Sequence, residues 1–336
     1  MGKILSISIA AYNAENDIRR CVDSLMDTPV AEQLDVIIVN DGSKDMTLQI
    51  AREYETRYPD IVRVIDKENG GHGSTINASL KVAVGKYYKI LDSDDWVEQD
   101  GIVKLVSILR EIEADLVLNP YHEIDAIDLK QKNTIYPYGE AITPGKIYSI
   151  DYADDIVIYM HSTTFKTSVI KKMGFQIDEM CFYVDMEYTL FPLRHVSNYV
   201  CFDFSVYDYL IGTVTQSMNK NSLIDRRNQH LKVTKRIIKF YEDVKMNVPE
   251  GTRRIILKRT KLALLNQYKI YYSMMPSDSL PEIKAFDKWV KSHSKEVYKG
   301  PIGRLMMNVK FNRKTGFLVY PAVIKIMKIM HLEPNL

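Results

Sequence analysis

Short runs of aliphatic and β-branched residues alternate with amphipathic stretches in the first part of the chain. Five runs have the length and composition of buried strands: residues 6–10, 36–40, 61–66, 87–91 and 115–119. Four stretches between them carry apolar positions at helical spacing: residues 16–26, 46–58, 74–84 and 101–112. Strands that alternate with helices in this way predict a doubly wound parallel sheet.

The pattern changes after residue 120. Residues 120–150 contain several prolines and glycines, which predicts a long excursion instead of another strand–helix unit. The later elements expected in the same domain are a strand near residues 162–165, a short helix near 167–173, and a pair of strands at 199–202 and 206–210. Little periodicity remains at 212–221, which predicts a hinge between a first domain, 1–215, and a helical second domain, 216–336.

Polar side chains stand at the ends of four consecutive predicted strands. They are Asn13, Asp41, Asn69 and Asp92. In doubly wound sheets, ligands bind beyond the carboxyl ends of the strands. Since these ends lie along one edge of the sheet, the four positions predict a binding site from topology alone.

The segment LDSDDW at residues 91–96 places three carboxylates directly after a strand. Asp92, Asp94 and Asp95 repel one another unless a cation joins them, and Mg²⁺ and Mn²⁺ prefer oxygen ligands. The segment therefore indicates a site for a metal ion and a diphosphate. The alternative is a helix N-terminus, because an aspartate at this point can cap the helix that begins near residue 98.

Charge divides the chain more sharply than its net value of +2 indicates. Residues 1–215 hold 20 Lys and Arg against 34 Asp and Glu, whereas residues 216–336 hold 25 against 9. The tail at 309–331 also mixes lysines with aromatic and aliphatic residues, which is typical of a helix at a membrane interface. The alternatives are that its apolar face packs on neighbouring helices and that the basic half docks against the acidic one.

Composition argues against several classes of protein. The sequence has no apolar run as long as a membrane span and no signal-peptide pattern, so we expect a cytoplasmic protein, peripheral at the inner face of the cell membrane if its basic half binds lipid. Cys21, Cys181 and Cys201 are widely spaced, which favours reduced core thiols. The sequence carries neither a P-loop nor a nucleic-acid recognition motif, which argues against a P-loop kinase and against nucleic acid as a partner.

Three further segments combine with LDSDDW in order and spacing: SIAAYN at 8–13, VNDGSKD at 39–45 and NGGHGS at 69–74. Together they resemble the family-2 nucleotide-sugar glycosyltransferases of the GT-A fold, of the type that builds bacterial cell-surface polysaccharides. The resemblance covers about residues 4–217. It implies an α/β domain with a doubly wound, Rossmann-like mixed sheet, followed in this chain by a smaller α-helical C-terminal domain.

The resemblance implies a nucleotide-binding set at the strand ends. Its members here are Ala10, Tyr12, Asp41, Asn69, Gly71, Asp92 and Ser93. Tyr12 is expected to stack on a uracil and Asp41 to accept a hydrogen bond from the base or ribose; a packed tyrosine and a turn aspartate are the alternatives. The glycine-rich loop is expected to expose N–H groups to the ligand. Ile76 stands where many relatives have an arginine, so that charge is absent or comes from another residue.

The resemblance also implies a cation, Mn²⁺ or Mg²⁺, and a general base. Asp94 is the expected metal ligand, with Asp92 beside it, and the ion would offset the charge on the departing diphosphate. Asp185 resembles the family's base, which takes the proton of the acceptor hydroxyl. Glu187 is the rival base, and either carboxylate could instead cap the following helix. One base without a carboxylate nucleophile implies inversion, so that an α-linked donor gives a β-linked product.

Other polar residues are candidates for contacts with the donor sugar or the acceptor. They are His161, Asp95, Glu187, Gln216 and Ser217. A lone histidine such as His161 is more often structural. The resemblance of Gln216 and Ser217 to a segment that closes over the pyrophosphate lacks the arginine that often precedes it, because Thr213 and Thr215 occupy this stretch.

The residues and the resemblance predict a metal-dependent, inverting glycosyltransferase of the hexosyltransferase type. Its donor would be a nucleoside-diphosphate sugar, with UDP as the expected nucleotide, and its acceptor a glycan or lipid-linked glycan. One alternative is a sugar-1-phosphate nucleotidyltransferase, which would need a basic, glycine-rich loop after the first strand that residues 11–15 lack. The other is a non-catalytic protein that binds a membrane surface, which leaves the aspartates unexplained.

Overall fold

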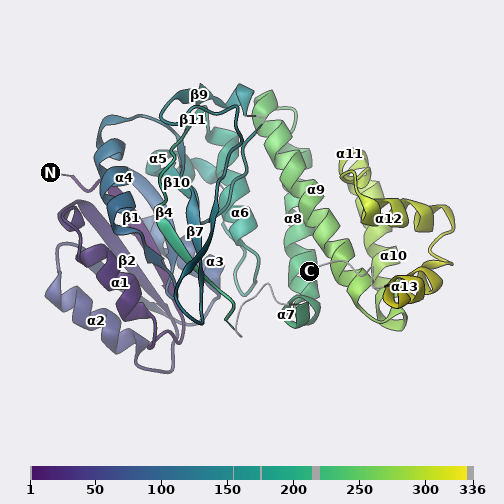
Figure 1. Ribbon diagram of the computed structural model, residues 1–336, viewed down its shortest axis with the longest axis horizontal. Coiled ribbons are helices and arrows are strands. Elements are labelled where there is room, and N and C mark those ends of the chain that lie inside the picture. Colours follow the sequence, from purple (N-terminus) through teal and green to yellow (C-terminus); the bar gives the residue numbers. More distant parts are fainter. Residues whose placement is uncertain (1, 154, 175, 214–219, 331–336) are drawn as a thin grey trace. The chain divides into compact units, whose positions relative to one another are not determined.

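The structure is a computed structural model that describes residues 2–330 except residues 154, 175 and 214–219. The chain divides into two units, Met1–Val214 and Thr215–Leu336. The first unit contains two β-sheets with their helices, and the described part of the second is helical (Figure 1).

A sheet of eight strands forms the centre of the first unit, in the order β3-β2-β1-β4-β10-β6-β11-β9. The strands are β1 (Leu5–Ala11), β2 (Leu34–Asp41), β3 (Val62–Lys67), β4 (Tyr87–Asp92), β6 (Leu116–Leu118), β9 (Ile147–Ser149), β10 (Thr163–Lys166) and β11 (Asn198–Cys201). The first four strands of the order are parallel, whereas β10 runs antiparallel to β4 and β6. The predicted mixed sheet is therefore confirmed.

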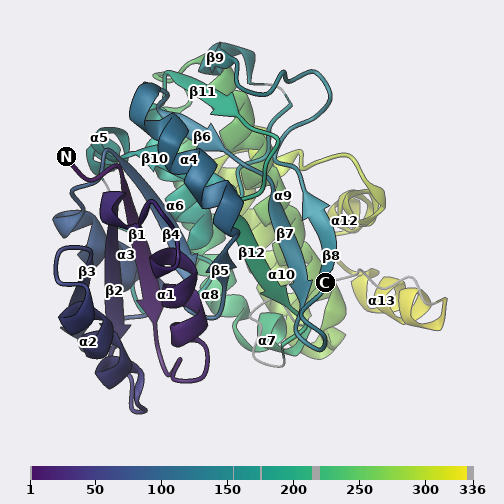
Figure 2. The ribbon, with the colours of Figure 1, turned by 60° about the vertical axis from the view of Figure 1, so that its left-hand side comes forward.

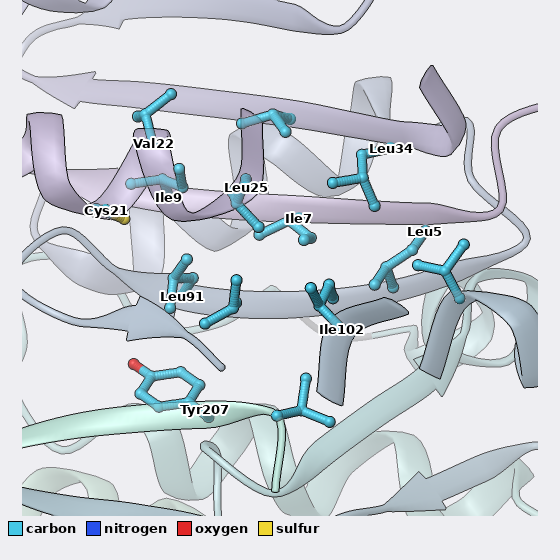
Figure 3. Packing of buried hydrophobic residues seen from close by; sticks show 14 of the residues in the cluster. Leu5, Ile7, Ile9, Cys21, Val22, Leu25, Leu34, Leu91, Ile102 and Tyr207 are labelled. Atoms are coloured by element: carbon cyan, nitrogen blue, oxygen red, sulfur yellow. The ribbon is translucent and has the colours of Figure 1, made fainter. Parts of the chain in front are cut away.

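Alternation along β1 decides which helices cover each face of this sheet. Leu5, Ile7 and Ile9 pack with Leu25 of α1 and Ile102 of α4 in one buried cluster (Figure 3). The helices that contribute to this cluster are α1 (Ile18–Met26), α2 (Thr47–Arg57) and α4 (Gln99–Glu111). Figure 2 shows α1 and α4 in front of the sheet. Apolar strand positions at every second residue meet the apolar stripes of these helices, and their removal from water stabilises the layer.

The other face of β1 carries serines and is covered by α3 (His72–Val82). The hydroxyls of Ser8 and Ser79 lie 2.7 Å apart, and that of Tyr88 lies 2.7 Å from Ser79 Oγ. These buried hydroxyls therefore satisfy one another, and their small side chains let the helix approach the sheet. The first unit also contains the short helices α5 (Thr167–Ile170) and α6 (Asp185–Leu190).

A second sheet has four strands in the order β5-β12-β7-β8. They are β5 (Trp96–Val97), β7 (Tyr121–Asp125), β8 (Gln131–Ile135) and β12 (Tyr207–Ile211). Residues 120–150, which the sequence predicts as an excursion, supply β7 and β8 to this sheet and β9 to the large one. Because β5 begins at the last residue of LDSDDW, the small sheet starts where the acidic segment ends.

The predicted pairing of residues 199–202 with 206–210 is wrong. The first run is β11, which pairs parallel to β6 in the large sheet, and the second is β12, which pairs parallel to β7 in the small sheet. Two consecutive segments, β6–β7 and β11–β12, thus pass together from one sheet to the other. Periodicity identifies a strand, but tertiary packing decides its neighbour.

The second unit consists of helices over its described residues. They are α7 (Lys220–Asp225), α8 (Arg227–Val244), α9 (Glu250–Ser273), α10 (Pro276–His293), α11 (Lys295–Tyr298), α12 (Arg304–Lys314) and α13 (Tyr320–Ile329). α8 and α9 run side by side, and α10 packs against α9 and α13 (Figure 1). Within the described part of the chain, no helix is both long and apolar enough to cross a bilayer.

Candidate functional site

The carboxyl ends of β1, β2 and β4 meet at one edge of the large sheet. In the parallel register, Ala10 of β1 lies between Val39 of β2 and Asp92 of β4. Asp41 is the last residue of β2, and Asp92 is the last residue of β4. The strand-end residues singled out by the sequence therefore lie at the same edge, where a doubly wound sheet binds its ligands.

Asp41 organises the glycine-rich loop that follows β3. Its buried carboxylate accepts hydrogen bonds from the N–H groups of Gly70 (2.9 Å) and Gly71 (2.7 Å), from Ser74 Oγ (3.1 Å) and from Lys67 Nζ (2.8 Å). These two loop N–H groups point to Asp41, so the expectation that the loop exposes them to a ligand is wrong for this pair. A buried carboxylate is costly without partners, and the loop supplies them.

The start of α3 also fixes the segment that leads to α6. Gly73 is packed so closely that a Cβ atom on it would lie 2.0 Å from the carbonyl oxygen of Asp178. Asn77 exchanges two hydrogen bonds of 2.9 Å with the backbone of Ile177. Because of these contacts, the segment before α6 lies against the same strand-end edge, although it is about 100 residues away in sequence.

Tyr207 of β12 holds the LDSDDW segment in place. Its hydroxyl accepts a hydrogen bond from the N–H of Asp92 (3.1 Å) and donates one to Asp95 Oδ2 (2.6 Å). The N–H of Leu210 donates to Asp95 Oδ1 (2.8 Å), so Asp95 ties β12 to the acidic segment. Arg20 of α1 donates to the carbonyl oxygen of Asp94 at 2.8 Å. These hydrogen bonds fix the conformation of the segment, and Asp95 helps to hold that conformation.

A group of possible metal ligands lies at this turn. One ligand atom each from Asp92, Asp95 and His161 lies within 4.8 Å of the others. His72 adjoins the group: its Nε2 is 3.6 Å from Asp92 Oδ1, is buried, and has no hydrogen-bond partner among the described residues. Two carboxylates suit Mn²⁺ or Mg²⁺, and an imidazole favours the transition metal. The residues present therefore fit the expected cation, whereas Asp94 is exposed and outside this group, and its assignment as a ligand stays a prediction.

Burial and charge shift several pKa values at this turn. Although part of its side chain reaches solvent, partial loss of water and repulsion from Asp92 raise the pKa of Asp94 to about 6. Burial and repulsion from Asp92 and Asp94 raise the pKa of the buried Asp95 well above its usual range. Burial, together with the charges of Lys89 and His72, lowers the pKa of His161 to about 3, so its imidazole is neutral. The carboxylates of this turn thus lie close together beside the neutral imidazole of His161, and a cation would stabilise this arrangement.

Lys89 and Tyr207 are site residues that the sequence analysis missed. Lys89 is buried in β4, and its Nζ donates to the carbonyl oxygen of His161 at 2.6 Å. Burial lowers the pKa of this lysine to about 7. The signal was present, because a lysine between Tyr88 and Ile90 interrupts an apolar strand. Tyr207 gave no comparable signal, since a tyrosine in a strand is ordinary.

The structure places the two candidate bases on one short helix. Asp185 is the first residue of α6 and is half-buried. Glu187 is fully buried, and its Oε2 accepts the N–H of Asp178 at 2.8 Å. The N-cap residue is Val184, which makes no side-chain capping bond. Glu187 therefore has a structural partner, whereas Asp185 lies nearer to solvent.

The remaining predicted residues differ in exposure. Tyr12 is 53% exposed and Asn69 is also exposed, whereas Ser93 is buried and Ala10 is half-buried. His161 is surrounded by rings, with centroids of Tyr121, Tyr207 and Tyr209 at 4.9, 4.9 and 4.2 Å. The predicted lid residues Gln216 and Ser217 lie outside the described residues.

Comparison with known proteins is consistent across sequence and structure. The profile of glycosyl transferase family 2 matches residues 6–174. A poly(ribitol-phosphate) beta-glucosyltransferase of Bacillus spizizenii is 34% identical over 117 residues, which is 34% of this chain and 18% of that protein. The matched stretches span between 10% and 33% of the curated relatives' own length.

Two solved structures share the fold. A fragment of S. aureus TarS in complex with UDP-GlcNAc has a TM-score of 0.60 at 16% identity and covers 88% of this chain and 82% of its own. The mannosyltransferase PcManGT of Pyrobaculum calidifontis, in complex with GDP-Man and Mn²⁺, has a TM-score of 0.51 at 12% identity and covers 88% and 85%. At such identities the likeness establishes the fold.

Proposed function

The chain belongs to glycosyl transferase family 2, and we propose that it moves a sugar from a UDP-sugar to a hydroxyl of a cell-surface polysaccharide or its lipid-linked precursor. The observation that carries this proposal is the ligand group of Asp92, Asp95 and His161 beside the loop held by Asp41. His72 joins the two, because it follows Gly71 in sequence and faces Asp92. A cation group next to a strand-end loop suits a nucleoside-diphosphate donor.

The similar proteins support the donor and the cation. TarS is described with UDP-GlcNAc, and PcManGT with GDP-Man and Mn²⁺. The relative from Bacillus spizizenii is a beta-glucosyltransferase that acts on poly(ribitol-phosphate). A β-linked product agrees with inversion of an α-linked donor, and a surface polymer agrees with the proposed acceptor.

In the proposed reaction, the oxygen of the acceptor hydroxyl attacks the anomeric carbon while the bond from that carbon to the diphosphate oxygen breaks. The acceptor proton moves to the carboxylate of Asp185, and UDP departs with the bonding electron pair. A divalent cation, when bound, offsets the charge on the diphosphate. Asp92, Asp95 and His161 would hold it, with Asp94 as the further ligand that the sequence indicates.

The nucleotide would lie along the strand-end edge. Tyr12 is exposed and free to stack on the uracil ring. Asp41 Oδ1 accepts three of the four hydrogen bonds that this carboxylate makes, and Oδ2 accepts the one from Gly71. Because a carboxylate oxygen has two lone pairs, Oδ2 retains capacity for a donor on the base or ribose. Ala10, Asn69, Gly71, Asp92 and Ser93 complete the proposed set.

A screen of nucleotide sugars tests this function. We expect the protein to release UDP from one or a few UDP-sugars in the presence of Mn²⁺, and to transfer the sugar when a polyol-phosphate or glycan acceptor is added. Chelation of the cation should abolish both reactions. Turnover that survives chelation, or a preference for a donor other than a UDP-sugar, would contradict the proposal.

A titration with Mn²⁺, followed by electron paramagnetic resonance, separates the candidate ligands. His161→Gln and Asp92→Asn should weaken Mn²⁺ binding if the group seen in the structure holds the ion. Asp94→Asn should weaken it only if Asp94 turns toward the ion when the ion binds. Asp60→Asn, at an exposed position between α2 and β3, is the matched control and should bind as the wild type does.

A further inference from the structure

The end of the helical unit buries one face of each of its two last helices. α12 buries Met306 and Val309, and α13 buries Tyr320, Ile324 and Met327. These positions recur at helical spacing, so they form one inward face on each helix. The amide of Asn308 in α12 lies 3.7 Å from the sulfur of Met327 in α13, so the two helices adjoin.

The outward faces of the same helices are apolar as well. Large hydrophobic side chains are exposed along residues 302–330: Ile302, Met307, Phe311, Leu318, Ile326, Ile329 and Met330. On α13, Ile326 and Ile329 stand on the side opposite to Ile324 and Met327. An exposed apolar surface of several neighbouring side chains is unfavourable in water and marks an interaction site.

Basic side chains share this stretch with the apolar ones, and residues 302–330 contain no acidic residue. The exposed basic residues are Arg304, Lys310, Lys314, Lys325 and Lys328. Arg313, which the sequence places among them, instead turns inward, with its Nε 2.8 Å from Asp287 Oδ1. The exposed charged residues of 302–330 therefore carry one sign of charge and lie among exposed apolar residues in the sequence, and the complement of such a surface is anionic with an apolar interior.

We infer that the outward faces of α12 and α13, with the connection between them, bind the headgroup region of an anionic lipid bilayer. The lysines reach lipid phosphates, while Phe311, Ile326 and Ile329 enter the boundary between headgroups and acyl chains. A bilayer fits better than a folded protein partner, because the lysines are interspersed among the apolar side chains and carry a single sign of charge. This inference does not depend on the proposed transferase activity.

Sedimentation of the full chain with lipid vesicles tests this inference. We expect binding to vesicles of phosphatidylcholine with phosphatidylglycerol, weak binding to phosphatidylcholine alone, and release at roughly 1 M salt, where charges are screened beyond ~3 Å. The double variant Lys325→Gln/Lys328→Gln should lower the partition coefficient about thirtyfold, because each basic residue near an anionic leaflet contributes about 1 kcal/mol.

Exposed apolar residues supply the second variant and its control. Ile326→Ser/Ile329→Ser should reduce vesicle binding about tenfold or more, since buried methylene groups provide the apolar part of the affinity. Met246→Ser changes a residue that is 83% exposed and lies outside this surface, and it should bind normally. All of these side chains are exposed, so thermal unfolding should confirm that each variant folds.

Three results would overturn the inference. The first is no binding to anionic vesicles at low salt. The second is binding that neither double variant reduces. The third is a stable oligomer, measured by light scattering, that dissociates in Ile326→Ser/Ile329→Ser, because the surface would then join copies of this chain.

Discussion

The two units of the chain bury charge in opposite ways. In the first unit, Asp92, Asp94 and Asp95 crowd at the end of one strand, and burial with mutual repulsion raises the pKa of Asp95 well above its usual range. In the second unit, the buried Asp287 has Arg313 Nε at 2.8 Å. The neighbours of Asp287 therefore stabilise its negative charge, whereas the surroundings of Asp95 in the first unit disfavour the charged form of that carboxyl group.

Hydrogen bonds to Asp287 add to this difference between the two units. Tyr268 and Tyr298 donate to Asp287 at 2.6 and 3.1 Å, and the guanidinium of Arg313 lies 3.6 Å from the ring centre of Tyr298. This network joins α9, α10, α11 and α12 through groups of the second unit alone. Among the described residues, no lysine or arginine forms an ion pair with Asp92, Asp94 or Asp95, so we expect a bound cation to stabilise the acidic turn of the first unit. Buried charge with its partners marks structure, and buried charge without them marks a binding site.

The largest expected effect separates activity from stability. Asp185→Asn should lower kcat about 10²- to 10⁴-fold, the usual contribution of a general base. UDP binding and the thermal midpoint should stay close to those of the wild type, because the change is nearly isosteric and half-exposed. Steady-state rates and calorimetry measure the two quantities.

Glu187→Gln is the informative companion to this variant. Glu187 is fully buried and accepts the N–H of Asp178, so its replacement should lower the thermal midpoint. If Glu187→Gln lost activity without losing stability while Asp185→Asn kept full turnover, the base would be Glu187 and the proposed assignment would be reversed.

In the second unit, we expect a substitution to lower stability and leave activity unchanged. Arg313→Met leaves Asp287 buried without its cation and should lower the free energy of unfolding by about 3–5 kcal/mol. Unfolding in urea measures the loss, and the transferase rate per folded molecule should be unchanged. The double variant Arg313→Met/Asp287→Leu should recover most of the stability, since it removes the unpaired charge. A rate that fell with Arg313→Met would show that the two units do not separate structure from activity.

Lys89 gives a smaller, pH-dependent effect. Burial lowers its pKa to about 7 in the folded protein, whereas an unfolded chain keeps the lysine protonated up to about pH 10. Between these values the unfolded state binds the extra proton, so stability should rise with pH by up to about 1.4 kcal/mol per unit. Lys89→Met should flatten this slope. Denaturation at about pH 7 and about pH 9 in both proteins checks it, and parallel slopes would argue against a neutral buried lysine.

The smallest expected effect concerns the cation and protons. The pKa of Asp94 is raised to about 6, so the metal-free folded protein holds a proton between about pH 4 and pH 6 that the unfolded chain has released. Stability of the metal-free protein should therefore fall as pH rises through this window. Mn²⁺ favours the carboxylate form, so it should raise the thermal midpoint by more at about pH 7 than at about pH 5. An equal shift of the thermal midpoint at both pH values would contradict the coupling between Mn²⁺ binding and deprotonation of Asp94.

The periodicity of apolar residues along the chain was enough to predict much of the fold. The five early strands and four early helices lie within two residues of their predicted ends, because period-2 and period-3.6 apolar patterns are properties of the chain itself. The mixed sheet came from the resemblance of a few motifs, whereas the helical C-terminal part was predicted from the pattern of the chain itself. The pairing of 199–202 with 206–210 failed, because each run had a better partner, β6 or β7, far away in sequence.

For the site, the sequence alone determined which acidic residues stand at the strand ends, since a strand that ends in LDSDDW must place its carboxylates at the sheet edge. Only the tertiary structure decided which groups face them. Tyr207 reaches Asp95 from a segment 112 residues away, and His161 joins Asp92 from another distant segment. The two Asp41 bonds to the loop, and the inward turn of Arg313, likewise depend on distant partners. The sequence determines which chemical groups stand at the strand ends, but packing in three dimensions determines which other groups contact them.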